Sequence, residues 1–78
     1  MEKYIIYMRY SRGPWAVCVK DIERERALKF LERIADHYRN GGHRVVSYRA
    51  KGTLRRLTIH TEGKPYKMHS WKVVAQSA

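Results

Sequence analysis

The chain has 78 residues, 44% of them hydrophobic, and its seventeen lysines and arginines against seven acidic residues give a formal charge of +10. This apolar content is too high for a disordered chain, and the length fits a single domain, residues 1–78, with a small core. No apolar run approaches the roughly 18 residues that cross a membrane, and the lone Cys18 excludes an intramolecular disulfide. We therefore expect a cytoplasmic protein whose positive charge attracts an anionic partner.

Two segments near the start of the chain have the composition of paired strands. Residues 4–10 and 15–20 are rich in β-branched and aromatic side chains, and the Gly-Pro sequence between them predicts a turn. Alternation along the first segment predicts one face with Tyr4, Ile6, Met8 and Tyr10, and another with Lys3, Ile5, Tyr7 and Arg9. We expect Cys18 to lie in the core and Trp15 to pack over the end of the sheet.

The next segment, residues 22–40, has the periodicity of a helix that buries one side. Asp21 is the predicted N-cap, and Gly41 or Gly42 is the predicted C-cap. At about 100° per residue, one arc of this helix collects the apolar side chains, namely Ala27, Leu28, Phe30, Leu31, Ile34, Ala35 and Tyr38. The helix is therefore predicted to cover one face of a sheet.

A second hairpin is predicted from residues 43–50 and 53–61, with Gly52 in the left-handed conformation at its turn. In its second strand Leu57 and Ile59 are predicted to face the helix, which turns the alternate side chains outward: Arg56, Thr58 and His60. The first strand of this hairpin has two possible orientations. One presents Arg44, Val46 and Tyr48 together, and the other presents His43, Val45, Ser47 and Arg49.

Residues 66–75 add a candidate fifth strand, so the predicted fold class is α+β. The element order is β-β-α-β-β-β, with an antiparallel sheet of four to five strands and one helix packed on one face. The apolar end of the fifth strand, residues 71–75, has two interpretations. It is either an edge that supports sheet extension or a homodimer, or a segment that completes the core of the monomer.

Positive charge is distributed unevenly along the chain. Residues 1–20 carry +3, residues 21–40 carry no net charge, and residues 41–78 carry +7. The charge excess therefore belongs to the predicted sheet and its turns. A helix with a neutral polar face also argues against binding to a membrane surface.

We predict a small, non-catalytic protein with a possible regulatory role that binds nucleic acid, DNA or RNA, mainly through phosphates. The sheet face away from the helix and the hairpin tips combine basic side chains with tyrosines, which suits phosphate contact and base stacking. The predicted contact residues are Arg9, Arg12, Arg44, Arg49, Lys51, Arg55, Arg56, His60 and Lys67. No metal site, cofactor or catalytic residue is predicted.

Two alternatives stay open at this point. In the first, the protein is encoded by a phage or mobile element and binds an acidic surface of a host or defence protein. In the second, it is a small metal-independent ribonuclease toxin that uses His60 or His43 with Arg56 and Tyr48 for proton transfer and charge stabilisation.

Overall fold

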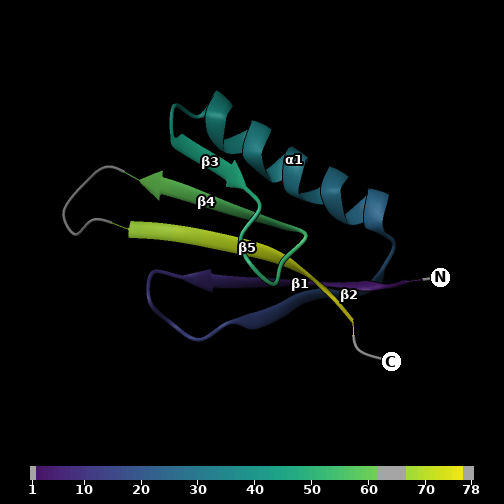
Figure 1. Cartoon of the computed structure of the whole chain (residues 1–78). Coiled ribbons are helices and arrows are strands. Elements are labelled where there is room, and N and C mark those ends of the chain that lie inside the picture. The colour runs from purple at the N-terminus through teal and green to yellow at the C-terminus, as the bar shows by residue number, and fades with distance from the viewer. Residues whose placement is uncertain (1, 62–66, 77–78) are drawn as a thin grey trace.

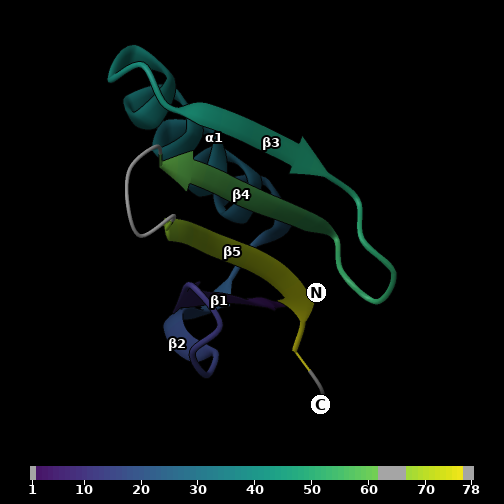
Figure 2. The same ribbon diagram turned by 90° about the vertical axis from the view of Figure 1, so that its left-hand side faces the viewer.

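Five strands and one helix follow one another as β-β-α-β-β-β in the computed structural model, which describes residues 2–61 and 67–76 (Figure 1). The elements are β1 (Tyr4–Tyr10), β2 (Ala16–Ile22), α1 (Arg24–Asn40), β3 (Arg44–Tyr48), β4 (Arg55–Thr61) and β5 (Lys67–Ala75). All strands join one antiparallel sheet in the order β2-β1-β5-β4-β3 (Figure 2). The predicted fold class is thus confirmed.

The fifth strand lies at the centre of this sheet, between β1 and β4. Its inward side chains complete the core, since Trp71 is 5% exposed and Val73 is fully buried. The interpretation of residues 71–75 as an edge is therefore wrong. The edge strands of the described sheet are β2 and β3.

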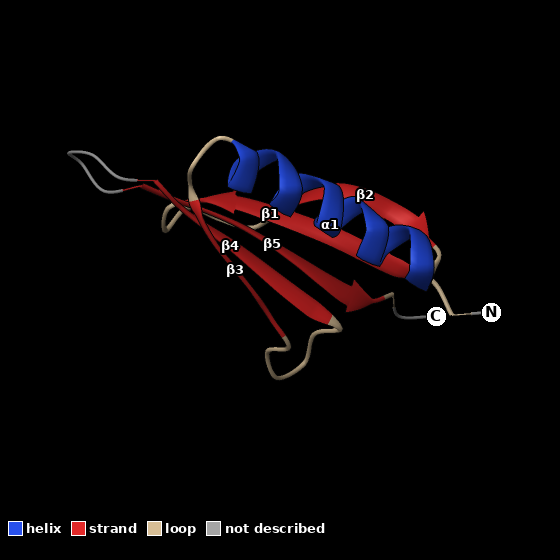
Figure 3. Cartoon of the chain, turned by 90° about the horizontal axis from the view of Figure 1, so that it is seen from above, coloured by secondary structure: helices blue, strands red, loops and turns tan. Residues whose placement is uncertain are grey.

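Helix α1 lies on one face of the sheet (Figure 3), and the core lies between the two. Its buried side chains come from β1, α1, β4 and β5 and are Tyr4, Ile6, Ala27, Leu31, Ala35, Leu57, Ile59, Trp71 and Val73. The predicted inward orientation of Leu57 and Ile59 is confirmed, because they are 1% and 0% exposed. Among the described residues, no helix has the length and apolar character that crossing a membrane requires.

The two ends of α1 differ in how well the sequence predicts them. Asp21 is not the N-cap: it belongs to β2, and its carboxylate accepts a 2.6 Å hydrogen bond from Gln76 Nε2, while Glu23 precedes the helix. At the other end, the amides of Gly42 and His43 donate to the carbonyls of Arg39 and Tyr38 in a Schellman arrangement. Gly42 has φ +84° there, so the predicted glycine cap is confirmed.

The prediction for Cys18 is wrong, because its side chain is exposed. It lies on the edge strand β2, whose pairing with β1 contains register shifts on either side of Ile6. These irregularities interrupt the simple alternation of faces, and the neighbouring Val17 is also 56% exposed. Partial desolvation raises the pKa of the Cys18 thiol.

We expect iodoacetamide to modify Cys18 in the folded protein, but more slowly near pH 8 than in the unfolded chain. The thiolate is the reactive form, and a raised pKa leaves less of it at that pH. The alkylation rate, followed by mass spectrometry from pH 7 to 10 with and without urea, checks this. Complete protection of the folded protein would contradict the exposed position.

Ile5 and Ile6 are neighbours in β1 that point to opposite sheet faces, and only Ile6 is fully buried against α1. We expect Ile6→Val to lower the free energy of unfolding by about 1 kcal/mol, because a buried methyl group is lost. Ile5→Val is the matched control and should cost less. Urea denaturation measures both, and equal losses would contradict the assignment of faces.

Candidate nucleic-acid interface

The sheet face opposite α1 carries a row of aromatic and basic side chains that crosses four strands. Strand register places Tyr48 of β3 opposite Arg56 of β4, Arg56 opposite Lys72 of β5, and Lys72 opposite Tyr7 of β1. Directly opposed residues of an antiparallel pair share a face, so the two cations lie between the two tyrosines. Tyr48 is 39% exposed at one end of the row.

This register also decides the orientation of β3. Arg44 pairs with His60 and Tyr48 with Arg56, so Arg44, Val46 and Tyr48 share the face opposite α1. We call this face, lined by Tyr7, Arg9, Arg44, Tyr48, Arg56, His60, Ser70 and Lys72, the cationic face.

Trp15 lies over the centre of the cationic face, in the connection between β1 and β2. Its ring centroid is 4.4 Å from Arg9 Cζ, 4.4 Å from Lys72 Nζ and 5.5 Å from Arg56 Cζ. Lys72 Nζ is also 5.5 Å from the centre of the Tyr7 ring. We call Arg9, Trp15, Arg56 and Lys72 the Trp15 cluster. It gathers basic side chains from β1, β4 and β5 around one indole.

Among residues 2–61 and 67–76, three buried polar atoms of this region have no hydrogen-bond partner: Arg9 Nε, Arg56 Nε and Ser70 Oγ. Ser70 is fully buried on β5, where it lies opposite Arg9 of β1 and Thr58 of β4. A buried polar group without a partner costs about 1–3 kcal/mol, and more when it is charged. The two arginines of the Trp15 cluster, and Ser70 opposite Arg9 in the sheet, therefore present buried hydrogen-bond donors without acceptors among the described residues.

The cations of the Trp15 cluster are also without a carboxylate partner in the part of the chain that the structure describes. The ion pairs found there join Lys3 to Glu23 at 3.9 Å and Arg39 to Asp36 at 3.3 Å, both outside the cluster. The indole face attracts each cation by about 0.5–2 kcal/mol, but it adds no negative charge. Within residues 2–61 and 67–76, no carboxylate thus offsets the charge of the cluster.

Other predicted contact residues surround the cluster at greater distance. Arg44 and His60 lie at the far end of the cationic face, and Arg12 is exposed in the connection between β1 and β2. Arg49 and Lys51 are exposed in the β3–β4 loop, which projects from the sheet on the side away from α1 (Figure 3). A hollow of about 510 Å³ lies against this loop and is also lined by Tyr4 and Ala75.

The turn of the β3–β4 loop forms as predicted, because Gly52 has φ +80° and the Thr53 amide donates to the Ala50 carbonyl at 3.0 Å. A positive φ at the third position of a turn is what a type II turn requires. The loop therefore owes its shape to Gly52 and leaves its basic side chains exposed.

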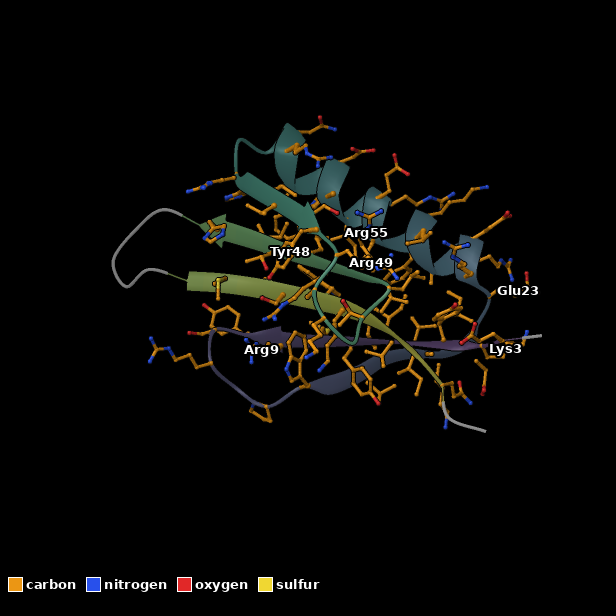
Figure 4. All side chains as sticks on the ribbon, viewed as in Figure 1. Lys3, Arg9, Glu23, Tyr48, Arg49 and Arg55 are labelled. Carbon is orange, nitrogen blue, oxygen red and sulfur yellow. The ribbon has the colours of Figure 1, made fainter. Side chains whose placement is uncertain are left out.

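Arg55 is separated from the other predicted contact residues by the sheet itself. It lies opposite Val73, on the face that packs against α1 (Figure 4). It lines a hollow there with Glu32 and Arg39. Adjacent residues of a strand point to opposite faces, so Arg55 and Arg56 cannot contact one ligand surface together. The side chain of Lys67 lies outside the described part of the chain.

The histidines of the ribonuclease alternative are not gathered with Arg56 and Tyr48. His60 is four positions beyond Arg56 on β4, about 13 Å along a strand. His43 lies near the end of α1, with its ring 5.7 Å from the ring of Tyr38. Among the described residues, no three His, Cys, Asp or Glu side chains gather where they could hold a metal ion.

Sequence reasoning did not assign a binding role to Trp15, Lys72 or Ser70. Alternation in residues 67–75 could have suggested the outward direction of Lys72, because Trp71 and Val73 on either side are apolar. The position of Trp15 over the sheet depends on contacts between strands distant in sequence, which no local pattern encodes.

Comparison with known proteins adds no relative, since no family model, curated protein or solved structure matches the chain.

We expect Ser70→Ala to raise the free energy of unfolding by about 1 kcal/mol, because it removes a buried hydroxyl without a partner. Ser47→Ala is the control: this serine is exposed on the α1 side of β3, and its loss should change stability by less than about 0.5 kcal/mol. Urea denaturation measures both. Destabilisation by Ser70→Ala would show that the hydroxyl is hydrogen-bonded.

Proposed function

We propose that this protein binds nucleic acid without catalysis and that it contacts phosphates through the cationic face and the adjoining loops. The observation that carries the proposal is the Trp15 cluster, where Arg9, Arg56 and Lys72 converge without a carboxylate partner among the described residues. Fixed positive charge of this density favours an anionic ligand.

The spread of the charge favours a polyanion over a small anion. Basic side chains extend from Arg44, at one end of the cationic face, through Arg56 to Arg49 and Lys51 in the projecting loop. Phosphates repeated along a nucleic acid match such an extended arrangement, and each contact releases counterions. The opposite side of the molecule is different, because residues 21–40, which include α1, carry no net charge.

The tyrosines favour a single-stranded ligand. Tyr48 and Tyr7 flank the cations in the row across the sheet, and aromatic rings beside phosphate-binding cations allow unpaired bases to stack. A duplex hides the faces of its bases, whereas a flexible strand can present base and phosphate to the same flat surface.

Affinity should fall steeply with salt. With four phosphate contacts, the logarithm of the binding constant for a single strand should fall with a slope of about −3 against the logarithm of salt concentration. Fluorescence anisotropy with labelled DNA and RNA, single-stranded and duplex, measures this. No binding at low salt would contradict the proposal and favour the alternative of an acidic protein surface.

Arg55 and Arg56 provide a matched pair of the same residue type on opposite faces of one strand. We expect Arg56→Gln to weaken oligonucleotide binding by about tenfold or more, since charge-assisted hydrogen bonds to phosphate are lost. Arg55→Gln removes the same charge on the α1 side and should change the affinity by no more than about a factor of two. Equal weakening would show that net charge alone, rather than the cationic face, controls binding.

A further inference from the structure

We infer that the Trp15 cluster is the binding site, or seat, of one backbone phosphate of the nucleic acid, and that the Trp15 ring is displaced when this phosphate binds. This inference rests on the proposed function, because it assigns a defined place on the cationic face to one phosphate of the bound strand. It adds a role for Trp15 that differs from that of a base-stacking platform.

The chemistry of these buried donors matches a phosphate better than it matches an indole. Arg9 Nε, Arg56 Nε and Ser70 Oγ are buried donors without acceptors, and they come from the adjacent strands β1, β4 and β5. A phosphate brings several acceptor oxygens and a negative charge, and its geometry fits the two-pronged donor edge of a guanidinium. An indole has one N–H donor and no acceptor atom. Trp15 therefore lies over the two guanidinium groups but cannot accept their hydrogen bonds.

Lys72 supplies the remaining charge of the proposed seat. Its ammonium group lies 4.4 Å from the centre of the Trp15 ring, as does the guanidinium carbon of Arg9. An ammonium group acts on phosphate as a point charge with three donors, so it can donate to a phosphate oxygen from many directions. The guanidinium groups of Arg9 and Arg56 would orient one phosphate by hydrogen bonds, and Lys72 would add a third positive charge.

The position of Trp15 in the chain permits the displacement. It precedes Ala16, the first residue of β2, and the pairing between β1 and β2 ends with Ala16 opposite Met8. The turn before it closes through the Gly13 amide and the Tyr10 carbonyl at 3.0 Å. Rotation of the Trp15 side chain therefore breaks no pairing of the sheet, which keeps the cations in place.

Removing the Trp15 ring distinguishes the two roles, because displacement by phosphate and stacking on a base predict opposite changes in oligonucleotide affinity. If Trp15 competes with phosphate for the cations, Trp15→Leu removes the competitor and tightens binding, by about threefold or more for the loss of one or more cation–π contacts. If Trp15 stacks on a base, the same substitution weakens binding by about fivefold or more. Circular dichroism before each titration confirms that the variant is folded.

The experiment compares the parent, Trp15→Leu, Ser70→Ala and Arg33→Gln, a control on the exposed side of α1. Each binds a labelled oligothymidylate of about ten nucleotides at low salt, followed by anisotropy. The parent is also titrated with unlabelled oligonucleotide and with inorganic phosphate while its tryptophan emission is recorded. Subtraction of the Trp15→Leu spectrum isolates Trp15, because Trp71 is buried in the core.

Three results would support the phosphate site. Trp15→Leu binds the oligonucleotide more tightly than the parent, and Ser70→Ala binds it about tenfold more weakly. The Trp15 emission of the parent changes and saturates along the binding curve. Weaker binding by Trp15→Leu would overturn displacement. Unchanged emission together with parental affinity of Ser70→Ala would overturn the seat and leave the proposed function standing. A response to inorganic phosphate without oligonucleotide binding would keep the seat and overturn the proposed function.

Discussion

The central position of β5 is the constraint on which the rest of the structure depends. It pairs with β1 on one side and with β4 on the other, and so joins two hairpins that are separated in sequence by α1. Alternation along β5 then directs Trp71 and Val73 into the core and Ser70 and Lys72 to the opposite face. Core and candidate interface are therefore two faces of the same strand, and neither exists before β5 has docked.

The side chains that suit the cationic face for its proposed function also lower the stability of the fold. A domain of this size has only a small core, and proteins in general are stable by about 5–15 kcal/mol. Buried donors without acceptors at Arg9, Arg56 and Ser70 consume a sizeable part of that margin. A ligand that supplies the acceptors binds only the folded chain and so stabilises it. If a polyanion binds as proposed, the protein is thus expected to be more resistant to unfolding in its presence.

Local patterns in the sequence predicted the elements better than they predicted the arrangement between them. The helix, its glycine cap and the inward residues Leu57 and Ile59 follow from periodicity and backbone chemistry, which act over a few residues. The N-terminal end of α1 did not follow, because Asp21 is held in β2 by Gln76 from the other end of the chain. For the same reason the Trp15 cluster could not be predicted: its side chains come from three strands and the loop before β2, and only the assembled register brings them together.

The turn between β3 and β4 has a consequence that reaches beyond the loop itself. The Leu54 amide donates to the Val73 carbonyl at 2.8 Å, so the turn sets where β4 begins relative to β5. A slip of β4 by one residue would exchange its two faces, bringing Arg56 and His60 against α1 and turning Leu57 and Ile59 toward water. The left-handed backbone at Gly52 thus helps to fix the register of β4, and a substitution there that shifted this register would bury the β4 side chains of the cationic face without changing any of them.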